Sequence, residues 1–143
     1  MKKIKLLLVD DERPFLETIS KRLEKRDLTV SAVYSGQDAL VQLENNTSIE
    51  VVILDVKMPG MDGIQTLVEI KKKFPLVEVI MLTGHATVES AIDGMKLGAF
   101  DYLMKPCDID ALVTKVEEAA SKKREHEEKI SEARIKEIIG RRG

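Results

Sequence analysis

The chain has 143 residues, of which 43% are hydrophobic and 34% are charged, so it holds enough apolar material for one folded core and too much for a disordered chain. Its net charge of −2 excludes a general attraction to nucleic acid or to anionic membranes. Residues 121–143 hold eight Lys or Arg and five Glu, a net charge of +3, so we expect one acidic domain, 1–120, and a mildly basic extension, 121–143.

Short apolar runs alternate with helical patterns from residue 4 onward. The runs are rich in Val, Ile and Leu and do not alternate between apolar and polar residues, which predicts strands buried on both faces. They lie at 4–9, 30–34, 51–54, 77–82 and 100–104.

Between these runs, apolar residues recur at helical spacing. The first helix is expected after Pro14, which suits a first turn, and the second after Ser35, three residues before the acid Asp38. The fourth is expected to end at Gly98, and the fifth to begin at Asp108. Five strand–helix units in strict alternation predict an α/β fold, with an open, doubly wound parallel sheet covered by helices on both sides.

The extension, residues 121–143, has a composition that favours a helix continuing the fifth one. Seven-residue spacing runs through positions 112, 116, 119, 123, 126, 130 and 133, which supports helix pairing. Lys123 and His126 interrupt that apolar seam, so we expect a monomer or a weak homodimer.

The location of the protein is expected to be cytoplasmic. The single cysteine, Cys107, cannot form an internal disulfide. No apolar run reaches the roughly 18 residues that a membrane span needs. The apolar start of the chain runs directly into Asp10 without a small-residue cleavage site, unlike a signal peptide.

Polar side chains follow four of the predicted strands. Asp10 and Asp11 come after the first strand, Asp55 after the third, Thr83 after the fourth and Lys105 after the fifth. Ligands of open α/β sheets bind outside the carboxyl ends of the strands, so these residues are expected to converge there. Each alone is an ordinary loop residue or helix cap, but three crowded carboxylates repel one another unless a cation binds them.

That set of residues predicts phosphoryl chemistry. Oxygen ligands in this number suit Mg²⁺. Asp55 can attack phosphorus as a carboxylate nucleophile and form a mixed anhydride. The Lys105 ammonium can neutralise the phosphoryl oxygens, and the Thr83 hydroxyl can donate a hydrogen bond to one of them.

The motifs around these residues resemble the receiver domains of two-component response regulators. The resemblance covers about residues 3–120 and rests on several motifs in the right order. These are Asp10-Asp11, the stretch from Asp55 to Gly63, Thr83-Gly84, and Tyr102 to Pro106. The stretch from Thr83 to Glu89, which includes His85, is similar to receivers that precede ATPase modules in transcription activators of the nitrogen-regulator type, although no such module is present.

The resemblance implies a flavodoxin-like sheet with strand order 2-1-3-4-5 and a phosphorelay function without enzymatic turnover of a substrate, in which the chain catalyses only its own phosphorylation and dephosphorylation. It implies that Asp55 receives phosphate from a sensor histidine kinase and that the chain then controls a downstream protein or output domain. It further implies that Asp11, Asp55 and the Lys57 backbone carbonyl ligate Mg²⁺, with Asp10 acting directly or through water. Tyr102 would be a rotating switch residue, and Lys105-Pro106 would be a cis peptide.

The strongest alternative is a Mg²⁺-dependent phosphohydrolase with an aspartyl-phosphate intermediate. The haloacid-dehalogenase-like group needs a second acid two residues after the nucleophile, and Lys57 occupies that position. Nucleotide binding is weaker, because no Gly-rich loop follows the first strand. Direct DNA binding is also weaker, because the 23 residues of the extension are too few for a helix-turn-helix domain.

Overall fold

A computed structural model describes residues 2–84 and 87–142 of the chain. Strands and helices alternate throughout, as the apolar periodicity predicts. The elements are β1 (Lys5–Val9), α1 (Arg13–Glu24), β2 (Thr29–Val33), α2 (Gly36–Asn45), β3 (Val51–Leu54), α3 (Gly63–Lys73), β4 (Glu78–Thr83), α4 (Val88–Lys96), β5 (Asp101–Met104) and α5 (Ile109–Arg142).

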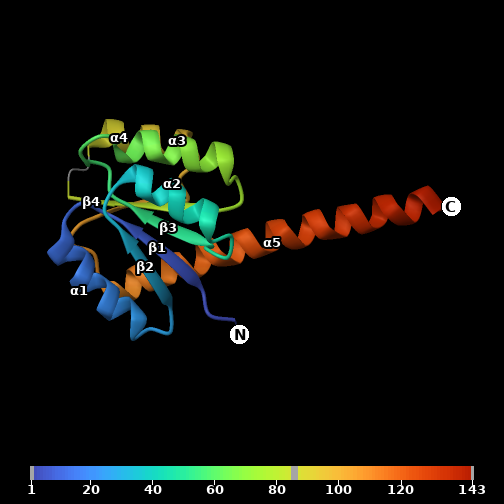
Figure 1. Ribbon diagram of the computed structural model, residues 1–143, viewed down its shortest axis with the longest axis horizontal. Coiled ribbons are helices and arrows are strands. Elements are labelled where there is room, and N and C mark those ends of the chain that lie inside the picture. The colour runs from blue at the N-terminus through green and yellow to red at the C-terminus, as the bar shows by residue number, and fades with distance from the viewer. Residues whose placement is uncertain (1, 85–86, 143) are drawn as a thin grey trace.

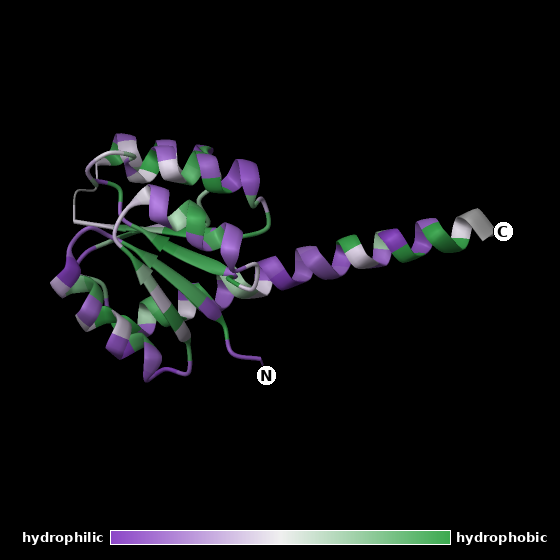
Figure 2. Ribbon diagram, in the orientation of Figure 1, coloured by the Kyte–Doolittle hydropathy of each residue, from purple (hydrophilic) through white to green (hydrophobic). Residues whose placement is uncertain are grey.

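The strands form one parallel sheet in the order β2-β1-β3-β4-β5, which confirms the predicted topology. Helices α1 and α5 cover one face, and α2, α3 and α4 cover the other (Figure 1). Alternate residues of β1 enter the two cores: Leu6 and Leu8 pack with α1 and α5, whereas Leu7 and Val9 pack with α2 and α3. The apolar strands between two amphipathic layers are visible in Figure 2.

The expectation that every strand is buried on both faces is wrong for the two edge strands. Strands β1, β3 and β4 are almost fully buried, but β2 and β5 are largely half-buried. An edge strand has a neighbour on one side only, and Thr29 and Asp101 place polar side chains in these two.

Local signals set the helix starts as predicted. Pro14 lies in the first turn of α1, and the Ser35 hydroxyl accepts a hydrogen bond from the Asp38 amide at the start of α2. Asp108 lies just before α5, and its Oδ2 accepts a hydrogen bond from the Ala111 amide at 3.1 Å. The first residue of the fifth helix is therefore Ile109, one residue later than the sequence pattern indicates.

Helix α5 runs unbroken for 34 residues and includes the predicted helical extension, which projects away from the sheet (Figure 1). Two ion pairs attach the first residues of the extension to the amino ends of the central strands β3 and β4. Arg124 binds Glu50 just before β3 at 2.7 Å, and Lys122 lies 3.7 Å from Glu78 of β4. We call these two pairs the extension clamp. Among the described residues, no helix combines the length and apolar character needed to cross a membrane.

Candidate functional site

The carboxyl ends of the central strands bring the predicted polar residues together. The Asp55 amide donates to the Val9 carbonyl at 3.0 Å, which aligns the end of β3 with the end of β1. The Lys105 amide donates to the Thr83 carbonyl at 2.9 Å, which aligns β4 with the residue that follows β5. Because the strands are parallel, residues separated by up to 95 positions in the sequence meet at one edge.

Three carboxylates form the centre of this edge. One oxygen each of Asp10, Asp11 and Asp55 lies within 4.8 Å of the other two, and we call this group the carboxylate cluster. Asp10 and Asp55 are buried, with exposed fractions of 3% and 2%, whereas Asp11 is exposed. Backbone amides orient the two buried groups: Glu12 donates to Asp10 at 3.0 Å and Val56 to Asp55 at 2.9 Å.

Lys105 brings an ammonium group into contact with this cluster. Its Nζ lies 2.7 Å from Asp10 Oδ2, 3.3 Å from Glu12 Oε1 and 4.1 Å from the centre of the Phe15 ring. Burial lowers the pKa of Lys105, but the hydrogen bond and charge of Asp10, followed by the charge of Asp55, raise it above its ordinary value. The amine is therefore protonated at neutral pH. The Lys105–Pro106 peptide is cis, as expected.

The Asp55 carboxylate has a raised pKa. Burial is the largest cause, and the negative charge of Asp10 adds to it. A hydrogen bond from the Thr83 hydroxyl, the charge of Lys105 and the Val56 amide act in the opposite direction. Thr83 is itself fully buried at the end of β4. Burial and Asp10 thus disfavour the ionised form of Asp55, whereas Thr83, Lys105 and the Val56 amide favour it.

The loop after Asp55 depends on close backbone contact at Gly63. A Cβ atom there would lie 2.1 Å from the Asp55 carbonyl oxygen, so only glycine fits without a shift of the backbone. The Gly63 amide donates to the Val56 carbonyl at 2.7 Å, and Asp62 caps α3 through a capping box with Gln65. These contacts hold the start of α3 directly behind the carboxylate cluster.

Lys57 and Tyr102 are the remaining predicted site residues in the described part of the chain. Lys57 is exposed in the loop two residues after Asp55. Tyr102 is half-buried on β5, and its hydroxyl lies 2.8 Å from the Ser90 hydroxyl in the first turn of α4. Its ring faces Gly94, where a Cβ atom would lie 3.4 Å from the ring. His85 lies outside the described residues.

Two site residues escape the sequence analysis. Glu12 and Phe15 both contact the Lys105 ammonium, one as a second anion and the other through its aromatic face. Glu12 directly follows Asp11, and Phe15 lies four residues after Asp11, which is a signal of proximity. However, the sequence does not show which side chains of this loop and of α1 face Lys105, because that depends on the rotational position of the helix.

The donor set fits a hard divalent cation. Three carboxylates and one ammonium leave an excess of negative charge, two of the carboxylates are buried, and all the ligand atoms are oxygen. Carboxylates at this spacing repel one another, and a bound dication removes that repulsion. Asp10, Asp11 and Asp55 are the residues that could hold it.

Comparison with known proteins agrees with this geometry. Residues 6–117 match the family model described as the response regulator receiver domain. The chain is 39% identical over 123 residues to the transcriptional regulatory protein ZraR of Salmonella typhimurium, and 36% identical over 121 residues to the DNA-binding transcriptional regulator NtrC of Escherichia coli. These alignments cover 86% and 85% of this chain but only 28% and 26% of the relatives, so the chain spans about a quarter of their length.

Solved structures show the same fold. A response regulator receiver domain protein from Clostridium thermocellum superposes with a TM-score of 0.81 at 40% identity, covering 85% of this chain and 97% of that one. NtrX from Brucella abortus gives a TM-score of 0.81 at 27% identity, covering 92% of this chain and 30% of that one.

Proposed function

This chain belongs to the response regulator receiver domains, and on that premise we propose that Asp55 accepts a phosphoryl group from a sensor histidine kinase in the cytoplasm. The observation that carries the proposal is the carboxylate cluster with Lys105 bound beside it. An oxygen of Asp55 attacks phosphorus as the bond from phosphorus to the kinase histidine breaks, and the imidazole leaves with the bonding electrons.

The surrounding residues have distinct tasks in this step. Lys105 neutralises charge on the phosphoryl oxygens, and Thr83 donates a hydrogen bond to another of them. Mg²⁺, held by Asp10, Asp11, Asp55 and the Lys57 carbonyl, with Asp10 bound directly or through water, would supply the remaining positive charge. Asp55 must be ionised to attack, so the charge of Lys105, which lowers its pKa, also favours the reactive form.

The phosphorylated chain then changes conformation through Thr83 and Tyr102 and controls a partner protein or output domain. It turns over no external substrate in this proposal. A phosphohydrolase of the haloacid-dehalogenase-like group would need an acid two residues after Asp55, where this chain has the exposed Lys57. The relative NtrC is named as a DNA-binding regulator, but this chain covers 26% of it, so we do not carry DNA binding over to these residues.

Acetyl phosphate, a small phosphodonor, provides the test. Intact-mass spectrometry should detect one added phosphoryl group on the wild type with Mg²⁺ and none when the metal is chelated. Asp55→Asn should abolish labelling, whereas Asp38→Asn, an exposed aspartate at the start of α2, should leave it unchanged. Labelling that persists in Asp55→Asn, or that proceeds fully in chelator, would contradict the proposal.

A further inference from the structure

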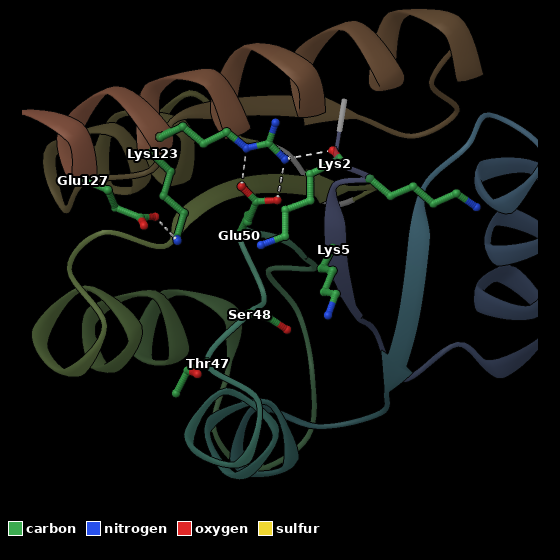
Figure 3. Close-up of a pocket in the computed structure, with 9 residues that line it drawn as sticks. Lys2, Lys5, Thr47, Ser48, Glu50, Lys123 and Glu127 are labelled. Carbon is green, nitrogen blue, oxygen red and sulfur yellow. Dashed lines mark hydrogen bonds and ion pairs between the residues drawn. The ribbon is translucent and has the colours of Figure 1, made fainter.

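A second charged site lies at the opposite end of the sheet, where the amino ends of β1 and β3 meet the extension. Here a pocket of about 410 Å³ opens between the start of the chain, the loop before β3 and the side of α5 (Figure 3). We call it the amino-edge pocket. Its volume lies in the range of small-molecule sites, and it shares no residue with the carboxylate cluster.

Hydrogen bonds connect the elements that form the pocket wall. Glu50 is buried, and both of its oxygens bind Arg124: Nε donates to Oε2 at 2.7 Å and the terminal nitrogen donates to Oε1 at 2.8 Å. The same terminal nitrogen donates to the Lys2 carbonyl at 3.3 Å. This fork-shaped contact fixes the extension, the loop before β3 and the start of the chain relative to one another.

The pocket carries more positive charge than these contacts use. Five of its lining residues are Lys or Arg and two are Glu, a net charge of +3 in a chain whose net charge is −2. Glu50 is bound to Arg124 and Glu127 to Lys123, while Lys3 pairs with Asp27 outside the pocket. Among residues 2–84 and 87–142, Lys2 and Lys5 have no ion-pair partner.

A third lysine of the pocket, Lys123, is buried. Lys123 is only 9% exposed, which is unusual for this residue type, and its ammonium lies on the pocket wall. In Figure 3 the side chains of Lys2 and Lys123 extend from two different elements toward the same space beside Glu50, and Lys5 lies on the adjoining wall. Lys123 is paired with Glu127, so the unpaired ammonium groups of Lys2 and Lys5 are the ones that leave a positive potential in this concavity.

We propose that the amino-edge pocket binds a small polyanion that carries phosphoryl groups, held by the ammonium groups of Lys2, Lys5 and Lys123. At least two negative charges are needed to neutralise the two unpaired lysines. Lysine binds phosphate as a point charge, without the planar fork that arginine offers to a carboxylate. The exposed Thr47 hydroxyl on the pocket rim can donate a hydrogen bond to a phosphoryl oxygen.

Binding there would also stabilise the attached position of the extension. Lys2 and Lys5 belong to the globular part, and Lys123 belongs to the extension, so one anion would bridge the two. A ligand that binds only this arrangement stabilises it by RT ln(1 + L/Kd), where L is the free ligand concentration, so the gain rises with that concentration. This inference does not depend on phosphorylation of Asp55.

Inorganic pyrophosphate is the probe, used with a metal chelator and at constant ionic strength. Titration calorimetry should detect binding to the wild type, and the melting temperature should rise with probe concentration. The double variant Lys2→Gln and Lys5→Gln should weaken binding at least tenfold. The matched control, Lys129→Gln and Lys136→Gln on the exposed part of the extension, should bind as the wild type does.

Three results would overturn the proposal: no binding to the wild type, equal binding to the pocket and control variants, or equal binding of succinate, a dicarboxylate without phosphoryl groups. Amide chemical shifts in the same titration locate the probe independently. Changes should centre on Lys5, Thr47 and Lys123. Changes centred on Asp55 and Lys105 would assign the binding to the carboxylate cluster and would also contradict the proposal.

Discussion

At the scale of single residues, Asp55 has the most consequential environment. Burial and the neighbouring Asp10 charge disfavour its ionised form, whereas Thr83 and Lys105 favour it. The balance leaves its pKa raised, so the metal-free fold carries a penalty whenever Asp55 is ionised. The same crowding of carboxylates destabilises the metal-free fold and favours the binding of a cation, which removes the repulsion.

The penalty predicts a pH-dependent gain in stability from Asp55→Asn. A carboxyl whose pKa is higher in the folded state gives its full contribution below the unfolded value of about 3.9 and loses it as pH rises through the folded value. In chelator at pH 7, Asp55→Asn should therefore be more stable than the wild type. We expect about 1–4 kcal/mol, the Coulomb energy of unit charges about 4 Å apart in media between water and a dielectric of about 20.

Urea unfolding at several pH values measures this difference. The gain should shrink as the pH falls through the folded value and below about 3.9, where Asp55 becomes protonated in both the folded and the unfolded wild type. Mg²⁺ should stabilise the wild type more than the variant. An Asp55→Asn protein that is less stable at pH 7 and equally stabilised by Mg²⁺ would refute this account of the carboxylate cluster.

Among the helices and strands, the sequence predicts those features that depend on a local pattern of apolar and polar residues. Apolar runs indicate the five strands, and the residues directly after them, such as Asp10, Asp55 and Lys105, meet because parallel strands end at one edge. The exposure of the edge strands β2 and β5 does not follow from the apolar runs themselves, but only from the strand order that the family resemblance implies.

Contacts set by helix phase are not predictable in this way. The Glu50–Arg124 pair joins residues 74 positions apart, and the Ser90–Tyr102 hydrogen bond joins two different elements. Both depend on which side of a helix faces the sheet, and neither has a motif of its own.

The extension clamp should contribute measurably to stability. Burial raises the pKa of Glu50, but the hydrogen bond and charge of Arg124 outweigh burial and lower it below its ordinary value. Arg124→Gln leaves that buried carboxylate without its partner, so we expect a loss of about 1–3 kcal/mol in the free energy of unfolding at pH 7. Arg134→Gln, exposed farther along α5, is the control and should change stability by less than about 0.5 kcal/mol.

The effect of Arg124→Gln should also depend on pH in the sense opposite to that of Asp55→Asn. A lowered pKa contributes stability above the unfolded value, about 4.3 for Glu, and loses it as the pH falls through the folded value. The difference between wild type and Arg124→Gln is therefore largest at neutral pH and shrinks as the pH falls below about 4.3 and through the folded value of Glu50. An equal loss in Arg134→Gln would mean that the clamp contributes nothing specific.

Strand β5 and helix α4 form the element pair that should respond to phosphorylation. An anion on Asp55 attracts the Thr83 hydroxyl, and this should shift the balance between positions of Tyr102, now hydrogen-bonded to Ser90. The chain has no Trp and two Tyr, so Tyr102 fluorescence can be followed in a Tyr34→Phe background. Tyr34→Phe keeps the aromatic ring, whose centre lies 3.9 Å from Arg13 Cζ, and removes only the hydroxyl.

Beryllofluoride with Mg²⁺, an inert substitute for the phosphoryl group, should change this emission in the Tyr34→Phe protein and far less after Thr83→Ala is added. Ser90→Ala should alter the starting emission, because it removes the hydrogen-bond partner of Tyr102. Equal responses with and without the Thr83 hydroxyl would show that Thr83 and Tyr102 are uncoupled.

At the scale of the whole molecule, the structure explains why the seven-residue spacing of α5 is a poor signal of pairing. The first positions of that series, Leu112, Val116 and Ala119, are buried against the chain's own sheet, and Lys123 is buried at the clamp. Only His126, Ile130 and Ala133 remain exposed for another copy, far less than the three to four heptads typical of a coiled coil.

Weak self-association at most is therefore expected for the 143-residue chain. Light scattering over a range of concentrations tests this, with a version ending at Glu127 as the comparison, because that version keeps the clamp. Both should be mainly monomeric at micromolar concentration. A tight dimer only in the longer protein would indicate pairing through residues 128–143, and a tight dimer in both would indicate an interface on the globular part.

The unbroken course of α5 has a mechanical consequence. Beyond the clamp, residues 128–142 form a lever about 22 Å long, since an α-helix rises about 1.5 Å per residue. A tilt of about 10° at its base would move the tip by about 4 Å, the sine of that angle times that length. The fulcrum lies at the amino ends of β3 and β4, the strands that carry Asp55 and Thr83 at their other ends. Small displacements of these two strands would thus be amplified at the tip, where a partner could sense them.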